Sequence, residues 1–173
     1  MLKIFKPYVS AKNVYEIDIN FFIKNNIKYV ICDLDNTLEA FYTKQPSEQA
    51  HKLFNDFKKA GIKFYIVSNN KMKRVKEYAD MLGCEYISEA RKPLKNKTKK
   101  FINLNKIITE QCIIIGDQVL TDIVLANRLK IKSILCENLV EKDQLCTKIN
   151  KFFDKNIRKK LIKKGELINW RSV

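Results

Sequence analysis

Short apolar runs alternate along the chain with longer amphipathic segments. The runs are rich in β-branched or aromatic residues, which predicts strands, and they cover residues 29–32, 64–67, 85–87, 112–115 and 132–136. Helical spacing predicts helices over residues 47–60, 73–82, 95–103 and 122–129. Alternation of this kind is typical of a parallel sheet with helices on both faces, so we expect an α/β fold with about five strands.

The length of 173 residues fits a single domain with one hydrophobic core, and we expect residues 1–173 to form it. Residues 1–28 are a lead-in, and residues 148–173 form a basic tail. Apolar positions in residues 148–164 have the spacing of an amphipathic helix. This helix either packs on the domain with its lysines in water or binds a surface, and the spacing alone favours packing.

The charge pattern points to anionic partners without choosing one. The chain has 34 Lys and Arg residues against 19 Asp and Glu residues, a formal net charge of +15. Such an excess favours nucleic acid or an acidic membrane surface. A compositional bias that spreads lysines over a solvated surface explains it equally well.

The cysteines and the apolar windows indicate a cytoplasmic protein. Three of the five cysteines, Cys32, Cys112 and Cys136, lie in or beside apolar runs, and no C-x-x-C pair occurs. This pattern is typical of reduced thiols in the cytosol. No signal-peptide core and no bilayer-spanning apolar window is present in the sequence, so any membrane association is expected to be peripheral, at the inner face of the membrane.

Two carboxylates stand where the first predicted strand ends. Asp33 and Asp35 are separated by one residue, and in extended backbone such side chains point to the same side. The pair alone is a weak signal, because Asp-rich turns after strands commonly satisfy backbone donors.

Three further polar sites follow the next three predicted strands. Residues 68–70 (Ser-Asn-Asn) offer a hydroxyl and amides, Lys92 offers a cation before a proline, and residues 116–122 place Asp117 and Asp122 around a turn. Each site has an ordinary structural explanation as a turn, a solvated lysine or an early-helix acid. Together they place four polar sites at one edge of the same sheet, where ligands bind in open α/β sheets, and this favours catalysis.

These motifs resemble those of the haloacid dehalogenase (HAD) superfamily: D-x-D-x-[TV], a Ser or Thr after the second strand, a Lys, and an acidic G-D-x(3,4)-D. The sequence is more closely similar to the YqeG family of subfamily IIIA, a bacterial group similar to phosphatidylglycerophosphate phosphatases of mitochondria and plastids. The stretches DLDNTL (33–38) and GDQVLTD (116–122) and the lead-in over residues 7–17 carry this resemblance. It implies a HAD-like Rossmannoid three-layer sandwich and a phosphatase.

The four aspartates of these motifs have candidate roles in phosphate-ester hydrolysis. Asp33 is the candidate nucleophile that forms an aspartyl-phosphate, and Asp35 is the candidate acid–base that serves the leaving oxygen and then the attacking water. Mg²⁺ prefers oxygen ligands, and the Asp33 carboxylate, the Asp35 backbone carbonyl and Asp117 are a plausible set. The family pattern implies that Asp122 acts behind them, on a metal-bound water or on Lys92.

The remaining site residues bind the phosphoryl group. Lys92 offsets its negative charge, and Ser68 with Asn69 and nearby backbone donors holds its oxygens. His51, the only histidine, lies in a predicted helix far from every motif and receives no catalytic role. With one His and no paired thiols, a Ser-His triad and a zinc site are excluded.

The spacing between motifs predicts a site without a cap domain. Residues 39–63 have room for little more than one helix, and residues 87–92 have room for none. An open site suits a phosphomonoester on a bulky body, and the resemblance and the charge favour the lipid headgroup of phosphatidylglycerophosphate at an anionic membrane.

The alternatives are a phosphatase of nucleic-acid ends or soluble phosphometabolites, and a nucleic-acid-binding module on a HAD fold. The intact acids and Lys92 disfavour the last, and no stable nucleic-acid partner is expected.

Overall fold

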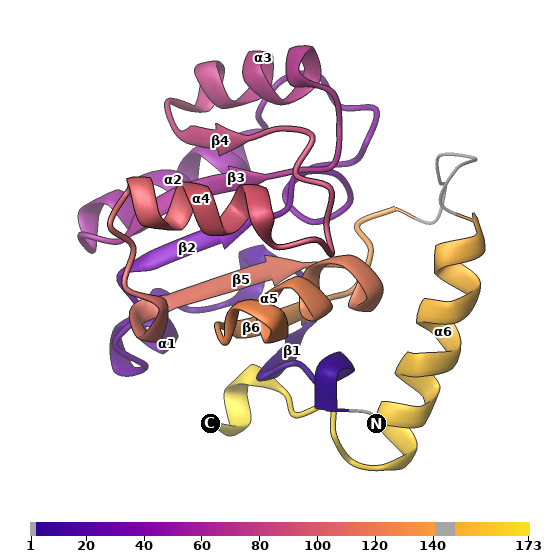
Figure 1. The fold of residues 1–173 in the computed structure, drawn as a ribbon. Coiled ribbons are helices and arrows are strands. Elements are labelled where there is room, and N and C mark those ends of the chain that lie inside the picture. The colour runs from indigo at the N-terminus through magenta and orange to yellow at the C-terminus, as the bar shows by residue number, and fades with distance from the viewer. Residues whose placement is uncertain (1–2, 141–147) are drawn as a thin grey trace.

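A computed structural model of the protein describes residues 3–140 and 148–173, which form an α/β fold around a six-stranded parallel sheet (Figure 1). The strands lie in the order β1-β6-β5-β2-β3-β4. They comprise β1 (Val9–Ala11), β2 (Tyr29–Cys32), β3 (Lys63–Val67), β4 (Glu85–Ile87), β5 (Cys112–Gly116) and β6 (Lys132–Cys136). The α-helices are α1 (Ile19–Lys24), α2 (Glu48–Lys59), α3 (Met72–Leu82), α4 (Asn96–Leu104), α5 (Val124–Leu129) and α6 (Lys148–Lys163). Short 3-10 helices are η1 (Lys3–Phe5), η2 (Val14–Glu16), η3 (Thr109–Gln111) and η6 (Trp170–Ser172), and η4 (Val119–Ile123) is a π-helix.

The five predicted strands are confirmed, and β1 is a sixth that the sequence pattern did not indicate. It lies in the predicted lead-in and adds to the sheet edge beside β6, with Val9 opposite Ile134. Its three residues are too short for a periodic signal. Its partner lies far along the chain, so no local pattern reveals the pairing.

The predicted helices are also confirmed, with small shifts at their ends. Ser47 caps α2, because its hydroxyl oxygen accepts from the Ala50 N–H at 3.2 Å. The helix expected over residues 122–129 begins instead as η4, and regular α-helix starts only at Val124. Helix α1 was not expected, and it buries Phe21 and Phe22.

Both faces of the sheet are buried, as a parallel sheet requires. Because side chains alternate along a strand, Val30 and Cys32 face one core cluster and Ile31 faces the other. Helices α1, α2 and α3 supply the first cluster, and α4 and α5 supply the second. Helix α6 stands apart from both layers, on the side toward which the strands point (Figure 1).

The tail and the cysteines agree with expectation where the structure describes them. Helix α6 packs on the domain through Leu161, which is fully buried. Cys32, Cys112 and Cys136 are buried free thiols. Cys146 lies outside the described residues.

Little chain is inserted around the carboxyl edge of the sheet. Between β2 and β3, α2 is the one helix formed by residues 33–62, and β4 is separated from Lys92 by a short loop. The expectation of a site without an inserted cap therefore holds for these two segments. Across residues 3–140 and 148–173, each helix is too short or too polar to cross a bilayer.

Candidate active site

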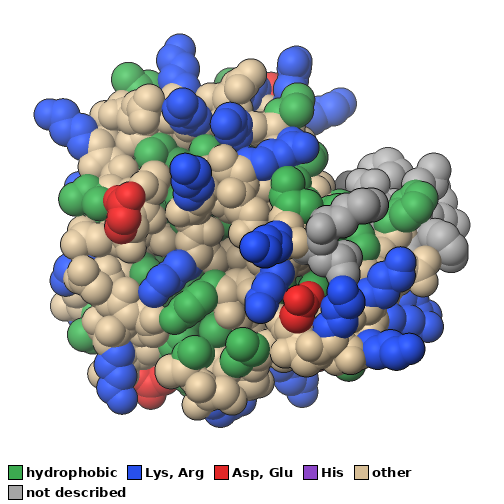
Figure 2. Space-filling model, turned by 60° about the horizontal axis from the view of Figure 1, so that its bottom comes forward, with side chains coloured by type: hydrophobic (Ala, Val, Ile, Leu, Met, Phe, Trp, Pro, Cys, Tyr) green, Lys and Arg blue, Asp and Glu red, His purple; other side chains and the backbone are tan. Residues whose placement is uncertain are grey.

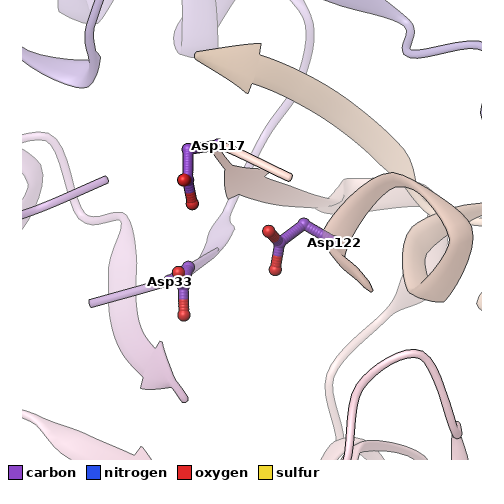
Figure 3. A group of neighbouring side chains, drawn as sticks. All are labelled: Asp33, Asp117 and Asp122. Atoms are coloured by element: carbon purple, nitrogen blue, oxygen red, sulfur yellow. The ribbon is translucent and has the colours of Figure 1, made fainter. Parts of the chain in front are cut away.

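The predicted motifs meet at the carboxyl edge of the sheet. Asp33 directly follows β2, Ser68 follows β3, Lys92 follows β4, and Asp117 follows β5. Figure 3 shows the carboxylates of Asp33, Asp117 and Asp122 directed toward one another. Each offers an oxygen within 4.8 Å of the others, and all three residues are buried. The topology thus gathers residues that are far apart in the sequence.

Lys92 is the centre of a buried charge network. Its Nζ donates to Asp33 Oδ1 at 2.6 Å, to Asp122 Oδ1 at 2.7 Å and to the Val67 carbonyl at 3.2 Å. These three acceptors match the three donors of an ammonium group. The Lys92 side chain is only 3% exposed, so the network is closed to bulk water. Lys92 therefore fixes Asp33 and Asp122 relative to each other.

The loop after β5 carries Asp117 and Asp122. Thr37 donates from Oγ1 to Asp117 Oδ1 at 3.1 Å, and the turn that presents Thr37 uses a left-handed backbone at Asn36, where φ is 66°. Asn tolerates this conformation better than most residues. A Cβ added at Gly116 would lie 2.2 Å from Asp122 Cγ. Glycine at this position therefore allows Asp122 to approach the strand end.

Asp35 belongs to a separate and more open cluster. Its Oδ2 accepts from Asn70 Nδ2 at 3.1 Å and from Ser68 Oγ at 3.5 Å, while its Oδ1 accepts from Arg74 at 3.3 Å. The guanidinium of Arg74 also lies over the Tyr78 ring, 5.5 Å from the centroid. The side chains of Asp35 and Arg74 are each 17% exposed. Asp35 is thus held by polar donors but retains access to solvent.

Asn69 has a different place from the one expected. Its side-chain amide donates to the Lys92 carbonyl at 3.0 Å, and its Oδ1 accepts from the Lys92 N–H at 2.6 Å. This pair of hydrogen bonds joins the loop after β3 to the loop after β4. In the structure Asn69 holds the backbone of Lys92, and its proposed contact with substrate stays a prediction.

The structure brings other sequence candidates together in two groups. Asp33 lies with Asp122 and Lys92, whereas Asp35 lies with Ser68. Arg74 was not predicted as a site residue, because in the sequence it resembles any other surface cation of a helix. The signal that could have found it is its place in the first turn of a helix that starts at the carboxyl edge of the sheet.

Burial is the largest influence on the pKa values of Asp33 and Asp117. Burial raises the pKa of Asp33 well above its ordinary value; the Lys92 ammonium opposes this shift, and Asp122 adds to it. Burial also raises the pKa of Asp117 to about 7, with a further contribution from Asp122. For Lys92, burial disfavours the charged form, but Asp122 and Asp33 outweigh it and raise the pKa. Lys92 therefore stays charged, whereas its single positive charge does not fully offset the cost of burying the charged forms of Asp33 and Asp117.

The donor set fits a hard divalent cation. Asp33, Asp117 and Asp122 contribute three carboxylates, and Lys92 contributes one positive charge, so the buried group carries an excess of negative charge when ionised. Carboxylate oxygens are the ligands that Mg²⁺ prefers. Asp122 is already engaged: Oδ1 accepts from Lys92, and Oδ2 accepts from the Gln118 N–H at 3.1 Å. That Asp33 and Asp117 bind the cation directly, with Asp122 behind them, stays a prediction.

The segment over residues 39–42, in the loop after β2, is divided between the core and the surface. Glu39 is buried. Its Oε1 accepts from the Ser47 N–H at 2.8 Å and from the Tyr78 hydroxyl at 3.3 Å, so Glu39 anchors α2 and α3. Tyr42, in contrast, is 61% exposed.

A buried aspartate after the central strand, paired with a lysine and facing two further acids on a parallel sheet, defines a phosphatase of the HAD superfamily. Comparison with known proteins gives the family. The chain belongs to the family described as mitochondrial PGP phosphatase, whose model matches residues 2–141. It is also 34% identical over 168 residues to the "probable phosphatase YqeG" of Bacillus subtilis, covering 97% of each chain.

Solved structures support the fold alone. A putative 3-deoxy-D-manno-octulosonate 8-phosphate phosphatase from Vibrio cholerae superposes with a TM-score of 0.51 at 16% identity, over 86% of this chain and 96% of that one. The cobalt-bound deoxy-D-mannose-octulosonate 8-phosphate phosphatase from Haemophilus influenzae gives the same TM-score of 0.51 and identity of 16%, over 66% of this chain and 80% of that one. The HAD-like α/β fold expected from the sequence is confirmed.

Proposed function

We propose that the protein is a Mg²⁺-dependent phosphomonoesterase that works through an aspartyl-phosphate and hydrolyses phosphatidylglycerophosphate at an anionic membrane surface. The observation that carries the proposal is the buried contact between Asp33 and Lys92 at 2.6 Å, with the oxygens of Asp117 and Asp122 nearby. A carboxylate fixed in this way at a sheet edge is suited to attack phosphorus rather than only to cap a turn.

In the first half-reaction the Asp33 carboxylate forms a bond to phosphorus while the bond to the leaving alkoxide breaks. Lys92 holds the carboxylate in one orientation and offsets phosphoryl charge. Ser68 is buried at the end of β3 and offers its hydroxyl to the phosphoryl oxygens. A bound Mg²⁺ supplies further neutralisation of phosphoryl charge, and Asp33, Asp117 and the backbone carbonyl of Asp35 would hold it.

Asp35 moves the protons. It donates one to the leaving alkoxide and then takes one from the water that hydrolyses the aspartyl-phosphate. Arg74 and Asn70 hold its carboxylate in place, and its partial exposure gives the proton a route to solvent. The division between a buried nucleophile and a more open acid–base matches these two tasks.

Membership of a family described as PGP phosphatase supports the lipid substrate. Exposed apolar residues in the loops at the carboxyl edge of the sheet support it independently. Tyr42, Met72 and Leu94 are 61%, 57% and 56% exposed, and they lie in or at the end of the loops that follow β2, β3 and β4. Exposed apolar side chains in the loops at this edge of the sheet suit an enzyme whose substrate is presented by a lipid surface.

The tail helix packs on the domain, as its apolar spacing favoured, and Leu161 is buried there rather than available for insertion into a membrane. Phe153 is 54% exposed and Ile162 is 64% exposed, whereas the side chain of Phe152 lies outside the described residues. Figure 2 shows Lys and Arg side chains scattered over a broad face rather than gathered in one patch. We therefore propose diffuse electrostatic attraction, which weakens with salt because exposed charges are screened over about 10 Å at 0.1 M.

The decisive experiment compares phosphate release from phosphatidylglycerophosphate in mixed micelles, a 5′-phosphorylated oligonucleotide and small phosphate esters, each with Mg²⁺ and with chelator. We expect the lipid to be hydrolysed fastest and only with Mg²⁺, and acid quenching with labelled substrate to trap phosphate on wild-type protein but not on Asp33→Asn. Faster hydrolysis of the oligonucleotide would show that nucleic-acid ends, rather than the lipid, are the preferred substrate. Full activity in chelator would refute the metal requirement.

A further inference from the structure

Helix α6 docks on the loop that carries Asp117. Asp154 on α6 accepts from the Val119 N–H at 2.6 Å and from the Leu120 N–H at 3.2 Å, so it caps the start of η4. These N–H groups begin a short helix and have no partner within it, and a carboxylate is favoured there. A residue of the tail thus completes the hydrogen bonding of the acidic loop.

Arg158 makes the second attachment. Its guanidinium donates to the backbone carbonyl of Asp117 and, at 2.9 Å, to that of Cys136 at the end of β6. Its Nε also donates to Asp154 Oδ2 at 2.9 Å, so the two tail residues orient each other. Arg158 therefore ties the peptide of a candidate metal ligand to a neighbouring strand of the sheet.

The contact is a built interface rather than a loose surface pair. Asp154 and Arg158 have side chains that are 10% and 23% exposed. Ile157 of α6 packs against Val119 and Ile123 of η4 in a small apolar cluster. The polar and apolar contacts of α6 converge on the same loop, at residues 117–123.

We propose that Asp154 and Arg158, which we call the α6 clamp, are positioning residues, which fix the Asp117 loop so that its carboxylate faces Asp33. The inference rests on the metal role proposed for Asp117. It gives the basic tail helix a task in catalysis that does not depend on any membrane. Groups that orient metal ligands from behind commonly change metal affinity or activity roughly 10- to 100-fold when removed.

The test uses the full-length chain with Arg158→Ala and Asp154→Ala, and Lys160→Ala as the matched control, because Lys160 lies exposed on the same helix. Mg²⁺ affinity of the protein without substrate is measured by calorimetric titration, and turnover is measured on a small soluble phosphate ester. We expect both clamp variants to bind Mg²⁺ roughly 10- to 100-fold more weakly and Lys160→Ala to match wild type. Asp154→Asn keeps an acceptor oxygen for the Val119 N–H and should retain most of the affinity.

The conservative variant keeps the proposal testable if an alanine variant unfolds. Arg158→Lys retains the charge but replaces the planar fork by a point donor, so an intermediate Mg²⁺ affinity at a normal melting temperature is expected. Clamp variants that are less stable yet bind Mg²⁺ and turn over as wild type would show a structural role only and overturn the proposal. If wild-type protein itself neither binds Mg²⁺ nor hydrolyses phosphate esters, the proposed function fails instead, so the two failures are distinguishable.

Discussion

The two halves of the candidate site differ in how firmly the protein holds them. Lys92 lies between Asp33 and Asp122 with side-chain exposures of 3%, 8% and 1%, whereas the side chains of Asp35 and Arg74 are each 17% exposed. The buried group is fixed by charge pairing out of reach of water. The open group is held by polar contacts that substrate and water can replace. The proposed nucleophile, Asp33, is therefore part of the buried scaffold, and the proposed acid–base, Asp35, lies at the boundary with solvent.

The largest effect is expected at Asp33, the proposed nucleophile. Asp33→Asn keeps the shape of the side chain and an oxygen for Lys92 but cannot form the aspartyl-phosphate, so turnover should fall roughly 10⁴-fold or more. Stability of the metal-free protein should be unchanged or higher, because burial makes the Asp33 charge unfavourable. Phosphate release and denaturant unfolding measure the two effects. Wild-type activity in the folded variant would refute the assignment of the nucleophile.

Lys92→Met should damage turnover and stability together. Loss of the cation removes stabilisation of phosphoryl charge, for which roughly a 10³-fold fall in turnover is expected. The sequence assigned Lys92 only the task of offsetting phosphoryl charge. Its burial between Asp33 and Asp122 adds a stability cost of about 3 kcal/mol, because removing one partner leaves buried charges uncompensated. Urea unfolding without metal checks this, and an unchanged midpoint would show that the network does not stabilise the fold.

The contrast also explains what the sequence could predict. Asp33, Lys92 and Asp117 follow strong strand signals, so the sheet edge could be anticipated from local patterns. The contacts that Arg74, Asp154 and Arg158 make could not be anticipated in this way, since they join segments that are distant in the chain. A usable signal existed for Asp154: it is the one acidic residue in positions 148–164, and helical spacing places it on the side of Ile157 and Leu161. A lone acid on the apolar side of a basic helix indicates a buried partner.

Asp35→Asn should separate chemistry from folding. The variant keeps the backbone carbonyl but loses the proton carrier, so turnover of an alkyl phosphate should fall roughly 10²- to 10⁴-fold. An aryl phosphate, whose leaving group needs less protonation, should lose less in its first step. Unfolding free energy should change by less than about 1 kcal/mol, because the side chain is partly solvated. Equal losses on both esters would argue against Asp35 as the acid.

The smallest effect is expected for Arg74→Ala, which removes one of the donors that hold Asp35. Asn70 and Ser68 still contact its Oδ2, so turnover of an alkyl phosphate should fall by less than about 10-fold, a partly exposed ion pair being weak. If Arg74 only orients Asp35, the loss should appear in kcat and shrink on an aryl phosphate, because that ester depends less on the acid. If Arg74 instead binds the substrate phosphoryl group, KM should rise equally for both esters. Lys73→Ala is the control, since Lys73 lies exposed on the preceding position of α3. An Arg74→Ala effect no larger than the control would show that the open half of the site is organised by Asn70 and Ser68 without the guanidinium.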